Sequence, residues 1–236
     1  RRTDRPGPEA RRRSMQTIAI PRRALLAAAP AALAFPRSAR ALPTDTPILF
    51  TVLRGGAPIG RHRVAFAQSG ATLAVEIEID LEVRFATIPV YRYVHRSREE
   101  WDGRRFIGLD ARTDDNGTRT EVRVRPAAGG LAVSGSGGDF LAPPETKPTS
   151  YWHEDMTRRT RLLDTQAGTL IDVRARQSGT ERASIAGREV EMRVYEVTGD
   201  LTSRLGYTQS GEWVDLEFKA RGSTIRYRRD TPPAAA

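Results

Sequence analysis

Five residues able to bind a ligand or transfer a proton share one parity between positions 91 and 101. They are Tyr91, Tyr93, His95, Glu99 and Trp101. If this segment is one β-strand, the five side chains project to the same face as a polar and aromatic stripe. Such a stripe can line a ligand pocket, with His95 as the group that titrates near neutral pH. The alternative, which we favour, is that the aromatic residues cap a core and His95 makes a structural hydrogen bond.

A second group of functional side chains is continuous in the sequence: Tyr151, Trp152, His153, Glu154 and Asp155. His153 with a neighbouring carboxylate has the composition of a general base and its orienting group. No partnered nucleophile is visible, however, so we favour an alternative in which Trp152 anchors a short helix and the acids complement its N-terminus. Trp213 is a further aromatic candidate for the lining of a pocket.

The chemistry of metals and cofactors is poorly represented. The chain has no cysteine, and its three histidines, His62, His95 and His153, do not stand at metal-ligand spacings. The run Gly135-Ser136-Gly137-Gly138 lacks the lysine of a phosphate-binding loop and predicts an ordinary loop. We therefore predict no catalytic residue, no metal site and no cofactor.

Alternating hydrophobicity is the strongest structural signal. Apolar side chains occupy every second position of residues 73–85, with charged side chains between most of them. This period of two predicts an antiparallel strand with one face on a core and the other in water. A strand of that length spans over about 40 Å and must coil strongly. Shorter alternations recur near residues 119–124, 190–194 and 214–218.

Turn signals separate these strands at spacings typical of successive hairpins, and no strand-helix-strand unit is evident. A Gly- and Pro-rich loop over residues 135–148 divides the strands into two groups, and residues 151–163 have apolar spacing compatible with one short helix. We predict an all-β fold, an antiparallel, strongly curved, half-open barrel-like sheet with one short helix.

The formal charge of +9 comes almost entirely from the first 41 residues, which carry ten Arg against Asp4 and Glu9. The remainder is nearly neutral with interspersed signs, whereas nucleic-acid binding needs a basic surface of one sign. We therefore predict no nucleic-acid partner.

The beginning of the chain has the order of an export signal. From Met15 onward, Arg22-Arg23 precedes an apolar run of about twelve residues, and the small residues up to Ala41 follow. The paired arginines resemble a twin-arginine signal, although the general secretory route stays open. We predict an upstream, disordered extension over residues 1–14, a signal peptide over 15–41 with cleavage near Ala41, and a single all-β domain over 42–236. The mature protein would be periplasmic, without a transmembrane segment.

Several short motifs resemble a family of exported bacterial proteins, the domain of unknown function 6134. The motifs are Ile59-Gly60-x-His62, Val90-Tyr91-Arg92-Tyr93-x-His95, Glu100-Trp101, Thr113-Asp114-Asp115-Asn116-Gly117, Ser150-Tyr151-Trp152, Leu162-Leu163-Asp164-x-Gln166-x-Gly168 and Gly211-Glu212-Trp213-Val214. The resemblance extends from about residue 48 to 228. It implies an all-β envelope protein and brings no established activity.

The favoured functional hypothesis is non-enzymatic: the concave sheet holds a lipid or another apolar or amphipathic envelope ligand. The candidate ligand-binding residues are Tyr91, Tyr93, His95, Trp101, Trp152, His153 and Trp213. Two alternatives stay open. One is a hydrolase-like periplasmic enzyme that uses His95 or His153 with nearby carboxylates. The other is an envelope protein-interaction module that presents a sheet edge.

Overall fold

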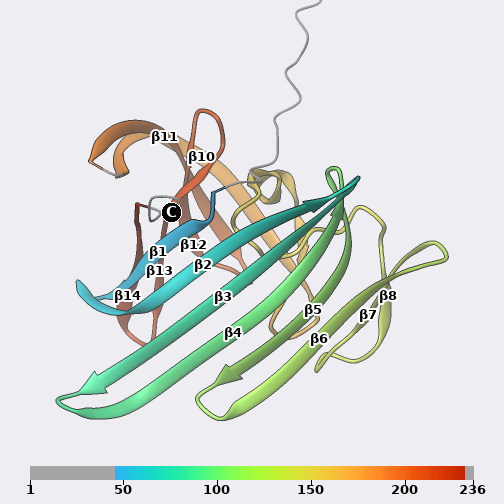
Figure 1. Cartoon of the computed structure of the whole chain (residues 1–236), viewed down its shortest axis with the longest axis horizontal. Coiled ribbons are helices and arrows are strands. Elements are labelled where there is room, and N and C mark those ends of the chain that lie inside the picture. Colours follow the sequence, from blue (N-terminus) through green and yellow to red (C-terminus); the bar gives the residue numbers. More distant parts are fainter. Residues whose placement is uncertain (1–45, 186, 232–236) are drawn as a thin grey trace, which may run out of the picture. The chain divides into compact units, whose positions relative to one another are not determined.

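The computed structural model describes residues 46–185 and 187–231, in which nearly the whole chain forms β-strands (Figure 1). The predicted extension (1–14) and signal peptide (15–41) lie outside the described residues. The strands are β1 (Ile48–Arg54), β2 (Ala57–Ser69), β3 (Thr72–Phe85), β4 (Ile88–Asp102), β5 (Arg105–Asp115), β6 (Thr118–Ala127), β7 (Gly130–Ser134), β8 (Phe140–Ala142), β9 (Arg161–Leu163), β10 (Leu170–Ile185), β11 (Arg188–Gly199), β12 (Ser203–Thr208), β13 (Trp213–Ala220) and β14 (Ser223–Arg229).

The strands of the described residues form one 14-stranded sheet in which every neighbouring pair is antiparallel. The order is β8-β7-β6-β5-β4-β3-β2-β1-β14-β13-β12-β11-β10-β9, so the first strand pairs with the last. The sheet curves strongly but does not close, because β8 and β9 stay at its two edges (Figure 1). The predicted half-open antiparallel sheet is confirmed.

The long strands arise where the sequence alternates. β3 covers Thr72–Phe85, in agreement with the alternation over residues 73–85, and β4 carries the predicted stripe. Opposite Glu100 and Trp101 the register shifts, and β5 supplies the extra residue. The parity of β4 is therefore kept, and His95, Glu99 and Trp101 are all buried on its inner face.

The predicted helix over residues 151–163 is wrong in its extent. A single 3₁₀ helix occupies Glu154–Arg158, and residues 161–163 already belong to β9. The polar run from Thr157 to Arg161 offers no apolar stripe to a longer helix. The chain instead extends and delivers the fully buried Leu162 and Leu163 to the sheet.

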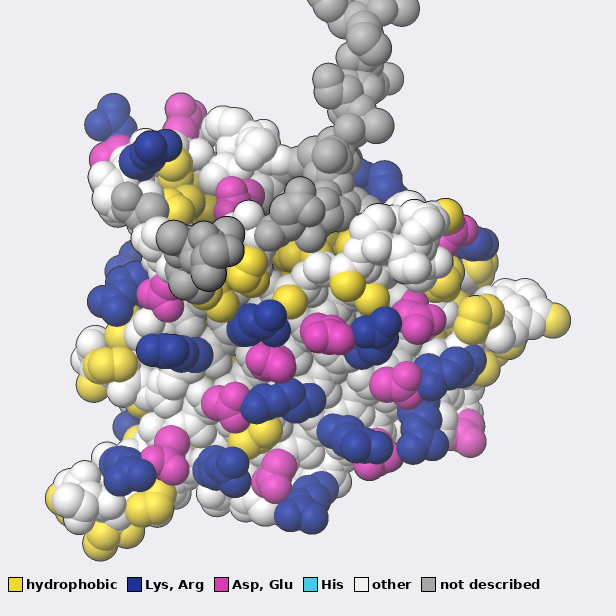
Figure 2. All heavy atoms as spheres, viewed as in Figure 1, with side chains coloured by type: hydrophobic (Ala, Val, Ile, Leu, Met, Phe, Trp, Pro, Cys, Tyr) yellow, Lys and Arg dark blue, Asp and Glu magenta, His cyan; other side chains and the backbone are white. Residues whose placement is uncertain are grey.

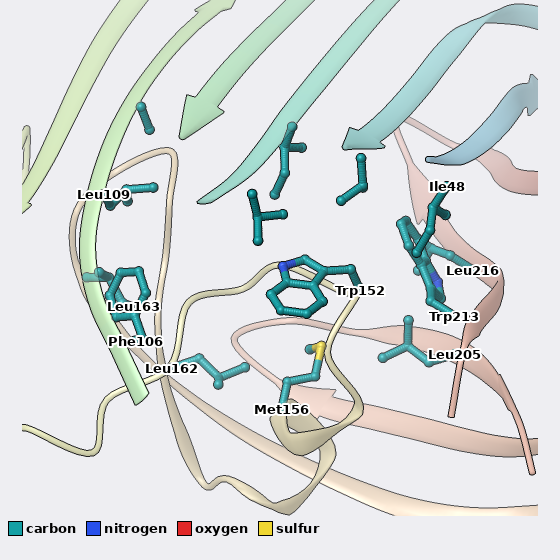
Figure 3. Packing of buried hydrophobic residues seen from close by; sticks show 14 of the residues in the cluster. Ile48, Phe106, Leu109, Trp152, Met156, Leu162, Leu163, Leu205, Trp213 and Leu216 are labelled. Atoms are coloured by element: carbon teal, nitrogen blue, oxygen red, sulfur yellow. The ribbon is translucent and has the colours of Figure 1, made fainter. Parts of the chain in front are cut away.

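Residues 143–160 connect the two edge strands, and we call them the covering segment because they lie against the inner face of the sheet. Trp152 and Met156 project from this segment into the same core as inner-facing side chains of the strands, among them Phe106, Leu109 and Leu205 (Figure 3). The segment thus supplies the second layer that a one-sided sheet requires to bury its apolar face.

Further contacts tie the covering segment to distant strands. Glu154 accepts hydrogen bonds from Arg193 Nη2 at 2.6 Å and from Tyr195 at 3.2 Å, both on β11. Arg104 Nη2 donates to Asp155 at 2.5 Å. The hydroxyl of Tyr207 on β12 donates to the backbone oxygen of Tyr151 at 2.8 Å. The segment is therefore held from both groups of strands.

The loop after β7 and the loop after β9 lie close together and are joined by hydrogen bonds. The backbone N–H of Gly137 donates to the oxygen of Ala167 at 3.2 Å, and Thr120 Oγ1 donates to the oxygen of Gln166 at 2.7 Å. A Cβ added to Gly135 would lie 3.0 Å from the Cα of Gly168. The backbone of the Gly-rich loop is therefore so close to residues 167 and 168 that a larger side chain at Gly135 would require the neighbouring backbone to move.

The outer face of the sheet is covered by charges of both signs. Figure 2 shows Lys and Arg interspersed with Asp and Glu over β2–β7, without a patch of one sign on this face. The pairs on β2–β4 are Arg96 with Asp80 at 2.6 Å, Arg98 with Glu76 at 2.8 Å and Arg63 with Glu78 at 3.6 Å. Such exposed pairs contribute a few tenths of a kcal/mol each and mainly keep this face in water. No helix of the described residues has the length and hydrophobicity to cross a bilayer.

His62 and His95 are both buried on the inner face of the sheet. His62 packs against the rings of Phe50, Trp213 and Tyr227 at centroid distances of 5.2–6.4 Å. Among the described residues, neither of its ring nitrogens has a hydrogen-bond partner. Burial, and secondarily His95, lowers the pKa of His62 from 6.5 to about 3. Burial, and secondarily Arg96, lowers the pKa of His95 to about 4, and its Nδ1 lies 2.8 Å from Thr113 Oγ1.

These lowered values predict acid destabilisation. The folded state keeps both rings neutral, so the unfolded chain binds more protons below pH 6.5. Each histidine therefore reduces the free energy of unfolding by about 1.4 kcal/mol per pH unit from 6.5 down to its folded pKa. In His62→Phe, which keeps an aromatic ring, we expect a shallower decline measured by urea unfolding at pH 7, 6, 5 and 4. If the free energy of unfolding of His62→Phe declined with pH as steeply as that of the native chain, the lowered pKa of His62 would be wrong.

Candidate functional site

A hollow of about 530 Å³ lies at the end of the sheet that carries the β3–β4 turn. Its walls come from β2, β3, β4, β13 and β14, and the covering segment contributes Tyr151. Within the structure as described, the opposite end of the inner face is filled by Trp101, Trp152 and Met156. The inner surface is therefore packed at one end and open at the other.

Strand alternation builds the apolar walls of the hollow. Ile79, Leu81 and Val83 follow one another on the inner face of β3 and line it. Ile59 on β2 and Phe218 on β13 add to the apolar surface. Because the charged residues between these positions point to solvent, the same alternation that makes the strand amphipathic makes the wall apolar.

Phenol groups gather inside the hollow. Tyr93, Tyr151 and Tyr227 line it. Burial raises the pKa of Tyr93, and the neighbouring phenols of Tyr227 and Tyr151 raise it further. Burial likewise raises the pKa of Tyr151 to about 12. All three are therefore neutral at physiological pH and offer hydroxyl groups for hydrogen bonding.

Charged and amide side chains also line the hollow: Arg54, Asp115, Asn116, Gln166 and Arg221. They come from strand ends and turns. The guanidinium of Arg221 stacks over the ring of Tyr91 at 4.8 Å and lies 3.9 Å from Asp115. Burial, with Asp115 as the next cause, raises the pKa of Tyr91 to about 12. The lining thus combines apolar walls with polar and basic groups, as ligand pockets commonly do.

A separate cluster of polar side chains lies in the filled part of the core. The carboxylate of Glu99 is fully buried and accepts hydrogen bonds from the indole N–H of Trp101 at 2.9 Å and of Trp152 at 3.0 Å. Burial raises the pKa of Glu99, while the hydrogen bonds from Trp152 and Trp101 partly oppose this. The carboxyl group therefore joins the covering segment to β4.

Two further groups contact the ring of Trp101. His153 stacks on the indole with 5.3 Å between ring centroids and 5° between planes. Lys147 Nζ lies 4.6 Å from the ring centroid and donates to the backbone oxygen of Arg104. Burial lowers the pKa of Lys147 to about 8. Although acidic and basic side chains meet here, the space beside Trp101, Lys147 and His153 admits no water-sized molecule.

The structure separates the seven candidate ligand-binding residues. Tyr91 and Tyr93 line the hollow. His95, Trp101, Trp152, His153 and Trp213 are buried in the core, each at most 8% exposed. The carboxylate alternatives are likewise engaged elsewhere: Glu99 binds two indoles, and Glu154 binds Arg193 and Tyr195.

Several residues of the hollow were missed by sequence reasoning. Tyr151 was noted only as part of a helix start, and Tyr227, Arg54 and Arg221 received no role. The alternation that places residues 79, 81 and 83 on the inner face of one strand could have predicted the apolar walls of the hollow. No local pattern indicates that Arg54 and Arg221, far apart in the sequence, reach the same hollow.

The Glu99 cluster yields a graded prediction. Glu99→Ala leaves two buried indole N–H groups without an acceptor and should lower the free energy of unfolding by roughly 2–6 kcal/mol. Glu99→Gln keeps an acceptor oxygen and should be far milder. Because a raised carboxyl pKa favours the protonated folded state, native Glu99 contributes a cost that grows as pH rises from 4.5 toward its folded pKa.

Urea unfolding at pH 5 and pH 8 tests both statements. The stability of Glu99→Gln relative to the native chain should improve between the lower and the higher pH. If the glutamine variant were as unstable as the alanine variant at both values, the proposed role of the carboxyl group would be wrong.

Comparisons of the sequence and of the fold with known proteins identify a family and a similar structure. No curated protein matches the chain. A crystal structure of a beta-barrel-like protein of domain of unknown function DUF1849 from Brucella abortus is similar, with a TM-score of 0.58 and 10% identity. The similarity covers 83% of this chain and 100% of that chain, and at this identity it bears on the fold alone. The model of the family "Domain of unknown function (DUF6134)" matches residues 50–230, in agreement with the resemblance of the short motifs. The chain therefore belongs to the DUF6134 family.

Proposed function

We propose that this chain is an exported envelope protein that holds the apolar part of an amphipathic ligand in the hollow of its curved sheet. The observation that carries the proposal is the open space of about 530 Å³ beside a tightly filled core. That volume falls within the range of roughly 300–1,000 Å³ common for small-molecule sites.

The lining supports an amphiphile over a purely apolar ligand. Ile79, Leu81 and Val83 offer an apolar wall suited to an alkyl chain. Arg54 and Arg221 bring positive charge, which is partly balanced by Asp115. The ligand class that fits is one apolar chain with an anionic or zwitterionic headgroup, and phenol hydroxyls add hydrogen-bonding partners.

The contacts of the alternative catalytic residues support a binding role over a hydrolase. His95 lies in hydrogen-bond distance of Thr113, and Glu99 binds two indoles. Neither residue lines the hollow. Within the described residues, the edge strands β8 and β9 have three residues each, but β9 pairs with only the first three residues of β10, Leu170–Asp172. Most of the outer edge of β10 (Leu170–Ile185) is therefore open, and a partner strand on that edge is the second candidate function.

Filling the hollow tests the ligand proposal. Val83→Trp should project an indole into the space and weaken the binding of a dansyl-labelled undecanoic acid by about tenfold. Glu82→Trp is the matched control, because the adjacent residue of the same strand points to the outer face. Dansyl fluorescence titration measures both, and far-UV circular dichroism checks the fold. Equal affinity in both variants, or no binding by the native chain, would sink the proposal.

Export is a separate part of the proposal and rests on the sequence. Arg22-Arg23, the apolar run and the small residues before position 42 supply the signal. When the chain is expressed in a Gram-negative host, we expect to recover it from the periplasm. Its intact mass should correspond to a product whose first residue lies near Leu42. Arg22→Lys together with Arg23→Lys should retain it in the cytoplasm if the twin-arginine route is used. A periplasmic product that still contains Met15 would contradict cleavage.

A further inference from the structure

Exposed apolar side chains concentrate at one turn of the sheet. Among the described residues, the large hydrophobic side chains that are strongly exposed are Phe85 (77%), Ile88 (64%), Val90 (54%) and Leu141 (55%). The first three belong to the β3–β4 hairpin, which we call the apolar tip. Figure 2 shows hydrophobic side chains at the corner of the molecule where this turn lies. Scattered exposed hydrophobic residues are ordinary, but a cluster at a protruding turn indicates a contact surface.

The chemistry of the turn is unusual for a hairpin. Its two central residues are Ala86 and Thr87, and Ala86 has a φ of 52°. Asn or Gly is the common choice for this left-handed conformation, as Asn116 and Gly117 illustrate in the β5–β6 turn. Pro89 and Val90 follow at a register shift. The turn thus carries Ala86 at a position where Asn or Gly is the common choice, and the apolar Phe85 and Ile88 flank the turn.

The apolar tip is continuous with the hollow. Val83 and Val90 line the hollow, and Phe85 pairs with Ile88 just beyond them at the end of the same hairpin. Apolar residues of one hairpin therefore belong both to the wall of the hollow and to the protruding turn. A chain that enters or leaves the hollow along this hairpin would stay in contact with apolar side chains.

Arginines accompany the tip. Arg84, one residue before Phe85, is paired with Glu82 at 2.5 Å, and Arg92 lies two residues after Val90. Arg54 and Arg221 line the hollow. An apolar wedge with guanidinium groups a few residues behind it matches the boundary between acyl chains and anionic headgroups. A fluid bilayer accepts a convex wedge without shape complementarity, whereas a protein partner needs a fitted groove.

We propose that the apolar tip inserts into the surface of an anionic lipid bilayer and brings the mouth of the hollow to the membrane, where an amphiphile exchanges between the two. The exchange step rests on the proposed function of the hollow. Insertion of the tip does not, so the two can fail separately.

Brominated lipids give a direct test of insertion. The three native tryptophans are each at most 3% exposed, so a tryptophan placed on the surface reports separately. In Phe85→Trp, vesicles of phosphatidylethanolamine and dibrominated phosphatidylglycerol should shift the emission to the blue and quench the added fluorescence at least about twofold. Leu141→Trp is the matched control, since Leu141 is similarly exposed but lies on edge strand β8. Its emission should stay unchanged.

Flotation of the full chain with the same vesicles gives the second measurement. Phe85→Ser with Ile88→Ser should reduce the bound fraction by roughly tenfold relative to Leu141→Ser. All variants keep the basic N-terminal residues, so these do not account for a difference. The double variant should still bind the dansyl-labelled undecanoic acid in solution.

The outcomes separate the hypotheses. If Phe85→Trp were quenched but the native chain did not bind the fatty-acid probe, insertion of the apolar tip would be supported and the ligand proposal would be wrong. Absence of quenching in Phe85→Trp, or equal flotation of the two serine variants, would overturn the membrane tip and direct attention to a protein partner.

Discussion

The inner face of an unclosed, curved sheet must be covered, and this chain covers it with its own connection between the two edge strands. The buried carboxylate of Glu99 fixes that connection, because it accepts one hydrogen bond from Trp101 on β4 and one from Trp152 on the covering segment. Burying a carboxyl group is costly unless it is hydrogen-bonded or protonated, and the raised pKa of Glu99 reflects that cost. Two indole donors on one oxygen specify where the segment lies, and the aromatic stacking of His153 on Trp101 extends the same anchor.

The position of this anchor divides the inner surface into two parts. Around Glu99 the core is closed by tryptophans, Met156 and the leucines of β9. Toward the β3–β4 turn the segment contributes only Tyr151, and the strands project beyond it around the hollow. The strands β3 and β4, of 14 and 15 residues, extend beyond the segment that covers them. The core is therefore packed where the segment covers the strands, and it is open where the strands extend further. In the proposed function, the polar residues at the open end favour a ligand with both apolar and charged parts.

Much of the fold was predictable because the period of two is a local property. The alternation over residues 73–85 predicted β3 closely, and the parity of residues 91–101 predicted a common inward face on β4. The helix over residues 151–163 was the failure, since a few apolar residues at helical spacing also suit an extended chain whose buried side chains meet a sheet. Of the seven candidate ligand-binding residues, Tyr91 and Tyr93 lie in the hollow, whereas the other five lie in the core. An inward-facing aromatic residue has the same sequence pattern whether it lines the hollow or packs in the core, so the sequence does not distinguish the two.

The sequence by itself determined the class of fold, the family, the scarcity of metal-binding chemistry and the concentration of charge in the first 41 residues, because each depends on composition or on neighbours along the chain. Only the tertiary structure decided that β1 pairs with β14, that the covering segment stops short of the β3–β4 turn, and that Arg54, Tyr151 and Arg221 reach one hollow. Those features depend on the curvature of the sheet and on contacts between residues that lie far apart in the sequence. Local periodicity carries no information about such distances.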